Sequence, residues 1–350
     1  MKTSDITVVF QGAFKPYIPR DGLPFAEILK RTRNSLPGAR ILLSAWEDSD
    51  VPEGMGVDDV VLSKDPGALA PLKLTDNKVN NVNRQIVSTR AGMKAVRTRY
   101  AVKLRTDCFL EHAGFIDYFQ TQLKRDAYRK RIVSSAFFTL DTTVFERIPY
   151  HVSDWFQFAE ADVLRAYWSA PLMTPQAGRY YEAHEHAPSS NIFERRFRAE
   201  YAVEQHIAMH YARQLGYVCP TYLNDISPPV LRDYERFLAR ETLIIDPWQI
   251  GLVFPKYQWI GGSTLQRINN IMHLDWLALA RQPSFDEVEP DVFARMMSER
   301  RRLKRVAQKL FAMSEPFHGL LFETSRRGRF VRRQAMRVFR TMQRLGRTGG

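Results

Sequence analysis

Residues 5–12, DITVVFQG, and residues 100–107, YAVKLRTD, decide the fold of this chain. Each is a run of β-branched, aromatic and apolar side chains that ends in polar residues, as expected for a buried strand. Residues 25–35 repeat apolar side chains at helical spacing and stop before a Leu-Pro-Gly turn, after which residues 40–46, RILLSAW, form a second strand. The sequence therefore predicts a strand, a helix and a second strand at its start.

Strands and helices continue to alternate along the chain. The expected elements are strands at 58–62, 132–138 and within 241–254, helices at 82–96 and 193–215, and loops at 151–158 and 169–190. Such alternation predicts an α/β fold with a mainly parallel, Rossmann-like sheet. Ligands of such sheets bind beyond the carboxyl ends of the strands, so that edge is where we expect the functional residues.

The composition is that of an ordinary folded protein. The chain has 350 residues, of which 45% are hydrophobic and 25% charged, and this excludes intrinsic disorder and a collagen-like repeat. Two cysteines, Cys108 and Cys219, are too few for a disulfide framework and indicate a reducing compartment. We find no apolar run of transmembrane length and no secretory signal, so we expect a cytoplasmic protein.

The excess positive charge is confined to the C-terminus. Residues 295–350 contain 16 basic and three acidic residues, which leaves 35 of each in residues 1–294. We therefore predict a neutral body, residues 1–264, and a helical, strongly basic C-terminal region, residues 265–350. The partner of that region is expected to be anionic.

The basic region predicts two amphipathic helices separated by a break at 314–328. The apolar positions of the first are Val292, Met296, Leu303, Val306, Leu310 and Phe311, and those of the second are Val331, Ala335, Met336, Val338, Met342 and Leu345. Docking on an anionic membrane surface, packing on the body and binding of nucleic acid are all open interpretations. The first is favoured because arginine-rich amphipathic helices suit membrane interfaces. Nucleic acid is disfavoured because aromatic residues are not interleaved with the arginines as stacking platforms, and no recognised binding motif appears.

Common catalytic and phosphate-binding motifs are missing from the sequence. We find no GxxxxGK loop, no GxGxxG after the first strand, no GxSxG and no HExxH. Attention falls instead on polar residues at the expected strand ends, which are Gln11 and Gly12, Trp46, and Arg105 and Asp107. A polar and basic helix segment, which contains Asn83, Arg84 and Arg90, precedes the last of these strands; its arginines can equally be plain surface charges.

Several of these segments together carry a family resemblance. They are DITVVFQG, LPGARILLSAWE, VVLSKDPG, NNVNRQIVSTRAGM with YAVKLRTD, and HVSDWFQF with the later pair Glu204-Gln205. With them the chain resembles the WavE lipopolysaccharide synthesis family of bacterial glycosyltransferases, over residues 5 to about 260. The basic C-terminus lies outside the resemblance.

The resemblance implies a fold similar to the GT-A nucleotide-diphospho-sugar transferases. It implies transfer of a sugar from a nucleotide-sugar to a lipopolysaccharide, capsule or other envelope-glycan acceptor. The implied donor-binding residues are Gln11, Gly12, Trp46, Asn83, Arg84, Arg90, Arg105 and Asp107. In GT-A enzymes an Asp-x-Asp motif holds Mn²⁺ or Mg²⁺ on the donor, but here the sequence is Arg105-Thr106-Asp107. Asp107 is then expected to bind a metal or a sugar hydroxyl, and the arginines to neutralise the diphosphate directly.

An inverting transferase also needs a carboxylate that takes the proton of the acceptor hydroxyl. The candidates are Glu204, ranked slightly higher, and Asp154, beside which Trp155 is expected to stack on the acceptor sugar. The simpler interpretations stay open: Glu204 on a solvated ion-paired helix face, Asp107 as a turn residue and Trp155 in the core. The acceptor is expected to be lipid-linked, with the enzyme peripheral on the inner face of the inner membrane. A non-catalytic membrane- or nucleic-acid-binding scaffold and a nucleotidyltransferase are the alternatives.

Overall fold

A seven-stranded sheet forms the centre of the computed structural model, which describes residues 1–14, 23–74, 77–126, 130–280 and 289–318. The strand order is β3-β2-β1-β4-β7-β6-β8. The strands are β1 (Ile6–Gln11), β2 (Arg40–Trp46), β3 (Asp59–Ser63), β4 (Tyr100–Arg105), β6 (Ile132–Ser135), β7 (Phe156–Glu160) and β8 (Thr242–Ile245). Only β7, among these strands, runs antiparallel to its neighbours. The predicted α/β fold with a mainly parallel sheet is confirmed.

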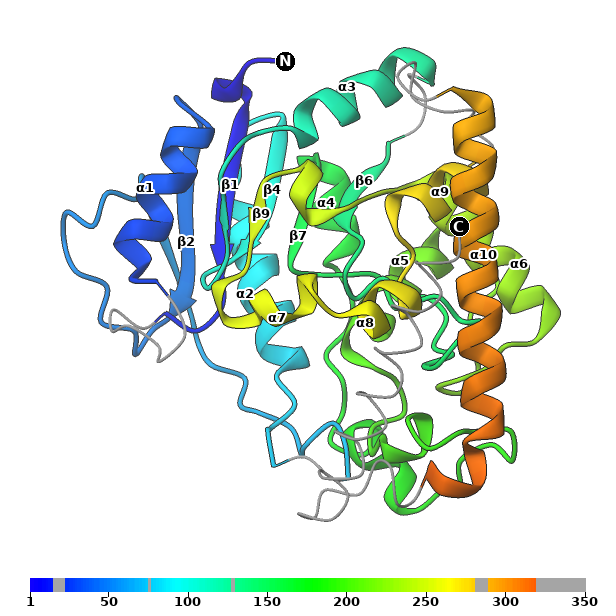
Figure 1. Ribbon diagram of the computed structural model, residues 1–350. Coiled ribbons are helices and arrows are strands. Elements are labelled where there is room, and N and C mark those ends of the chain that lie inside the picture. The colour runs from blue at the N-terminus through cyan, green and yellow to red at the C-terminus, as the bar shows by residue number, and fades with distance from the viewer. Residues whose placement is uncertain (15–22, 75–76, 127–129, 281–288, 319–350) are drawn as a thin grey trace.

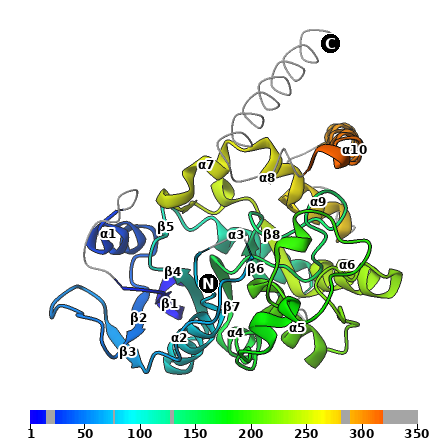
Figure 2. The ribbon, with the colours of Figure 1, turned by 90° about the horizontal axis from the view of Figure 1, so that it is seen from below.

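Helices cover both faces of the sheet. In Figure 2, α2, α4 and α5 lie on one face, while α1 and α3 lie on the other. The helices of the body are α1 (Phe25–Ser35), α2 (Val82–Ala95), α3 (Phe115–Arg125), α4 (Ala161–Tyr167), α5 (Val203–Gln214), α6 (Pro228–Glu241), α7 (Gln258–Gly261), α8 (Thr264–Asn269) and α9 (His273–Leu279). Because both faces are covered, every residue of β1 is buried. This explains why the central strands read as continuous apolar runs.

Helix α2 lies unusually close to the sheet, and Gly92 makes this possible. A Cβ atom at this position would lie 2.5 Å from Cγ1 of Val9 and 3.1 Å from Cβ of Ser44. Ser44 also donates a hydrogen bond of 2.7 Å to the carbonyl oxygen of Ser88. The close contact fixes the helix on β1 and β2, so that its first turn lies at the carboxyl edge of the sheet.

Three expected elements differ in the structure. The helix predicted over 193–215 is wrong in its first half, where a 3₁₀ turn, η3 (Glu194–Arg196), precedes an extended residue and α5 begins only at Val203. The strand predicted over 132–138 ends at Ser135, and Phe138 adopts a positive φ of 67°. Part of the loop predicted over 151–158 is strand β7, because Phe156 and Phe158 are core residues.

A long helix, α10 (Pro290–Met313), follows the body and corresponds to the first of the two C-terminal helices expected from the sequence. It is joined to the body by Arg300, whose Nη2 lies 2.5 Å from Oδ2 of Asp275. Trp276 of α9, beyond the expected domain boundary at 264, belongs to the same hydrophobic core as the sheet. The second expected helix lies outside the described residues. Within the described residues, none of the helices has the length and apolarity that a bilayer crossing needs.

Candidate active site

A cavity of about 720 Å³ opens at the carboxyl edge of the sheet. Of the residues proposed from the sequence, those that line it are Gln11, Gly12, Trp46, Arg84, Arg105, Asp107 and Asp154. Asn83, Arg90, Trp155 and Glu204 are not among the described lining residues. Most of the residues selected at the strand ends therefore share one cavity.

The topology explains why these residues meet. Strands β1, β2 and β4 are parallel, so Gln11, Trp46 and Arg105 end at the same edge. Strand β7 is antiparallel to β4, so its start, which follows Asp154, lies at that edge as well. Gly12 has a φ of +134°, and a Cβ there would lie 3.0 Å from Oγ1 of Thr106, so the close approach of these two turns requires glycine.

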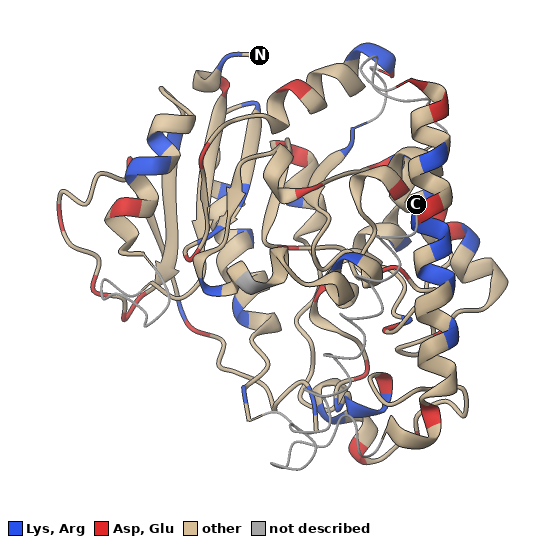
Figure 3. Ribbon diagram, in the orientation of Figure 1, with Lys and Arg blue, Asp and Glu red and all other residues tan. Residues whose placement is uncertain are grey.

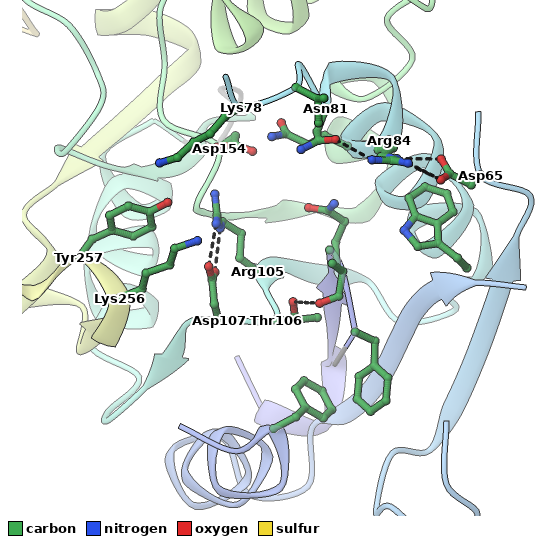
Figure 4. A pocket seen from close by; sticks show the side chains of 18 of the residues that line it. Asp65, Lys78, Asn81, Arg84, Arg105, Thr106, Asp107, Asp154, Lys256 and Tyr257 are labelled. Atoms are coloured by element: carbon green, nitrogen blue, oxygen red, sulfur yellow. Dashed lines mark hydrogen bonds and ion pairs between the residues drawn. The ribbon is translucent and has the colours of Figure 1, made fainter. Parts of the chain in front are cut away.

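Arg105 and Asp107 form a two-point ion pair on the cavity wall. Nε and Nη2 of Arg105 donate to Oδ1 and Oδ2 of Asp107 at 2.8 and 2.7 Å (Figure 4). Burial disfavours the ionised carboxylate, but Arg105 and then Lys256 outweigh it, and the pKa of Asp107 is lowered. Asp107 is therefore an anion at neutral pH, and both of its oxygens face a guanidinium.

A second pair of the same kind stands across the cavity. Arg84 donates from Nε and Nη2 to Asp65, with an Nη2–Oδ2 distance of 2.6 Å, and from Nη1 to Oδ1 of Asn81 at 3.0 Å. The hydrogen bonds from Arg84 are the largest cause of the lowered pKa of Asp65. The sequence analysis did not select Asp65 as a site residue, although its position in the Lys-Asp-Pro-Gly turn beyond β3 was a usable signal.

Two further lining residues, Lys256 and Tyr257, come from η5 (Pro255–Tyr257), a segment that the sequence analysis did not select. The guanidinium carbon of Arg105 lies 5.9 Å from the Tyr257 ring and 5.4 Å from the Trp155 ring. Trp155 is only 5% exposed and its ring lies 4.7 Å from that of Tyr257. Trp155 thus supports Arg105 and Tyr257 from behind the cavity wall.

Asp154 faces the cavity but is held from below by a buried lysine. Lys103, which is fully buried on β4, has its Nζ 3.1 Å from Oδ2 of Asp154 and also donates to the Asp154 backbone carbonyl. Burial, opposed by Asp154, lowers the pKa of Lys103. The pair places one carboxylate on the cavity wall in a fixed position.

Glu204 lies in the first turn of α5 and pairs with His151. Nε2 of His151 is 3.3 Å from Oε2 of Glu204, while Nδ1 is 2.8 Å from the carbonyl oxygen of Phe138. Because a carbonyl only accepts, Nδ1 carries the hydrogen, and a neutral ring would turn its Nε2 lone pair toward the carboxylate. Burial, opposed by His151, raises the pKa of Glu204.

Asn83 and Arg90 have partners elsewhere. The side chain of Asn83 bonds both the backbone oxygen and the backbone nitrogen of Met173, at 2.9 and 2.8 Å. Arg90 donates to the carbonyl oxygens of Trp168 and Ala170. These contacts join α2 to the segment after α4, and they give neither residue a place on the cavity wall.

The carboxylates of the cavity do not fit a divalent cation. Asp107, Asp65 and Asp154 each face a cationic side chain, as described above, and a metal ion at any of them would displace that partner. In the described part of the chain no cluster of three or more His, Cys, Asp or Glu residues has the arrangement of a metal site. The metal expected at Asp107 has no support from this geometry.

Fold and site together define an α/β protein with an arginine-bearing cavity at the carboxyl edge of a mainly parallel sheet. The chain belongs to the WavE lipopolysaccharide synthesis family, whose sequence profile matches residues 6–308. The match reaches into α10, further than the resemblance seen in the sequence. No curated protein matches the chain.

Solved structures give only weak likenesses. A CMP:2-keto-3-deoxy-manno-octonic acid synthetase in complex with CTP is 11% identical, with 49% of this chain and 80% of that chain covered and a TM-score of 0.30. A 4-diphosphocytidyl-2C-methyl-D-erythritol synthase from Anaerococcus prevotii is 16% identical, with 53% of this chain and 78% of that chain covered and a TM-score of 0.29. A cytidylyltransferase from Leptospira borgpetersenii is 13% identical, with 51% of this chain and 68% of that chain covered and a TM-score of 0.31. Scores this low carry no argument about function.

Proposed function

We propose that the chain is a glycosyltransferase, similar in fold to the GT-A transferases, that moves a sugar from a nucleoside-diphosphate donor to a glycan or lipid-linked glycan of the bacterial envelope. Membership of a lipopolysaccharide synthesis family supports the pathway. The observation that carries the proposed reaction is the position of Arg105 on the wall of a cavity large enough for a nucleotide-sugar.

Arg105 is suited to the departing diphosphate. It uses the Nε–Nη2 edge for Asp107, and in the described part of the chain its Nη1 makes no hydrogen bond. A guanidinium can therefore keep its carboxylate and still donate to a phosphate oxygen. Lys256 adds a second cation beside it (Figure 4). Arg84 differs, because its Nη1 is already bonded to Asn81. We assign charge neutralisation to Arg105 and Lys256, and orientation of the cavity wall to Arg84.

The proton of the acceptor hydroxyl needs a carboxylate that reaches the substrate. Asp154 lines the cavity, whereas Glu204 is not among the described lining residues. Oε2 of Glu204 lies 3.3 Å from Nε2 of His151. We therefore propose Asp154 as the general base. For the acceptor sugar, Tyr257 offers a ring on the cavity wall, and Trp155 supports that ring.

The test measures nucleotide binding before activity. Thermal shift with UDP, GDP, CDP, ADP and CMP, each in EDTA and in Mn²⁺, should show stabilisation by one nucleoside diphosphate that persists in EDTA. Arg105→Gln should weaken its binding at least tenfold. Arg40→Gln is the matched control, because it breaks an Arg–Asp pair, 2.7 Å from Asp59, at the amino end of β2.

Three results would contradict the proposal. Stabilisation by polyanions alone, lost with salt, would indicate a scaffold. Incorporation of pyrophosphate into a nucleoside triphosphate would indicate a nucleotidyltransferase. Binding that Arg105→Gln and Arg40→Gln reduce equally would remove Arg105 from the site. Once the donor is known, Asp154→Asn should abolish transfer while donor binding survives.

A further inference from the structure

Helix α10 has two distinct faces, and only one of them packs on the body. Met297, Lys304 and Ala307 are buried on the inner face. Nζ of Lys304 lies 2.5 Å from Oδ2 of Asp141 and 3.1 Å from Oδ2 of Asp275. Aromatic packing adds to these ion pairs, because the ring of Phe311 lies 5.3 Å from that of Phe145 and 5.6 Å from that of Phe193. Other apolar side chains of the helix stay exposed.

Five exposed apolar side chains form a row along the outer part of the helix, which we call the apolar row. It consists of Met296, Leu303, Val306, Leu310 and Met313, which are 44%, 37%, 45%, 40% and 75% exposed. The spacing of three, four and seven residues places them on one side of the helix, with Glu299 between the first two. Phe317, just after the helix, is 62% exposed. Exposed apolar rows of this length mark an interaction surface.

A second row, the basic row, runs beside it. Arg295, Arg302 and Lys309 are exposed and seven residues apart, and each immediately precedes a member of the apolar row. At about 100° per residue they form one positive flank along the helix. Figure 3 shows basic residues along α10, which lies at the periphery of the molecule in Figures 1 and 2.

The geometry points to an anionic membrane surface as the partner of this outer face. An amphipathic helix with a basic flank inserts its apolar side chains at the headgroup level while Arg and Lys bind lipid phosphates. A second copy of the same face is a poorer partner, because it would bring Arg295, Arg302 and Lys309 against a like-charged row. The inference rests on α10 alone and does not depend on the proposed sugar transfer.

Co-sedimentation of the full chain with vesicles tests the inference. Vesicles of phosphatidylcholine alone are compared with vesicles of phosphatidylcholine and phosphatidylglycerol in equal parts. We expect binding to the anionic vesicles only. The double variant Leu303→Gln/Leu310→Gln should lower the partition coefficient at least tenfold, and Arg302→Gln/Lys309→Gln should lower it roughly thirtyfold. All four side chains are exposed, so the variants should fold.

Leu172→Gln/Leu215→Gln is the matched control. These leucines are 42% and 44% exposed, much like Leu303 and Leu310, but lie outside α10. The inference is overturned if the full chain does not bind anionic vesicles, or if both leucine pairs lower binding equally. It is also overturned if sedimentation shows a dimer that Leu303→Gln/Leu310→Gln dissociates, because the outer face would then be a subunit contact. Nucleotide stabilisation should survive in every variant, which separates this test from that of the proposed function.

Discussion

Two carboxylates near α9, the half-buried Asp246 and the buried Asp275, should respond oppositely to replacement by asparagine. Burial raises the pKa of Asp246 from 3.8 to about 6, so its ionisation opposes folding. A shift of about two units corresponds to about 3 kcal/mol, which partial exposure reduces to about 2 kcal/mol. Because the pKa of Asp246 is raised, the ionisation of this side chain lowers the free energy of unfolding as pH rises from about 4 to 6. Asp246→Asn keeps an oxygen for the backbone N–H of His273, now 3.0 Å from Oδ1, and removes the charge.

We therefore expect Asp246→Asn to be neutral near pH 4 and to increase the free energy of unfolding by about 2 kcal/mol at pH 7 and above. Asp275→Asn is the matched control, because Arg300 and Lys304 outweigh burial and lower the pKa of Asp275. That variant should lose about 3 kcal/mol at pH 7, since it leaves Arg300 without a carboxylate partner and Lys304 with Asp141 alone. Urea unfolding at pH 4, 5, 6 and 7 measures both. An Asp246→Asn gain that does not grow with pH would refute the reasoning.

Three other substitutions test the core and the site. Lys103→Met leaves the buried carboxylate of Asp154 beside an apolar side chain, so the free energy of unfolding should fall by about 3–5 kcal/mol, as measured by urea unfolding. An unchanged free energy of unfolding would mean that the fold does not need the pair. Gly92→Ala forces a Cβ against Val9 and should cost about 1–3 kcal/mol, and an unchanged urea midpoint would show that α2 can move away. Burial raises the pKa of Glu204, so ionisation of this side chain lowers the free energy of unfolding as pH rises above 4.5. Glu204→Gln should therefore gain stability relative to the native protein as pH rises, and urea unfolding of both proteins across pH 4 to 8 would contradict us if their difference did not change with pH.

The sequence predicted those parts of the fold that residues adjacent in the chain determine. The apolar runs of β1, β2 and β4 predicted their own burial, and helical spacing predicted α1 with its bounds. Parallel pairing then brought the residues after β1 and β4 together, as a sheet of this class requires. These parts of the fold and of the cavity follow from local pattern and a general rule of topology.

The sequence did not predict the features that depend on contacts between residues far apart in the chain. The sequence predicts Glu194 as an exposed helical residue. In the structure it is buried, and it accepts hydrogen bonds from three nitrogens of Arg147 and from the side chain of Asn224. Lys256 reaches the cavity because a short strand, β9 (Leu252–Val253), pairs with β5 (Phe109–Leu110). Neither contact has a signal in the residues around it.

The two Arg–Asp pairs of the cavity explain how cationic side chains can be held in a fixed orientation on a partly buried wall. An unpaired guanidinium there would lose hydration without compensation, and its side chain would sample many rotamers. A carboxylate bonded along one edge removes both penalties and fixes the orientation of the opposite edge. Arg105 keeps that edge available, whereas Arg84 uses it for Asn81. At the position where the GT-A resemblance predicts a metal-binding carboxylate, this chain thus carries its own cation, and Asp107 serves to hold it. That difference explains why we expect donor binding to persist in EDTA and to depend on Arg105 more than on Arg84.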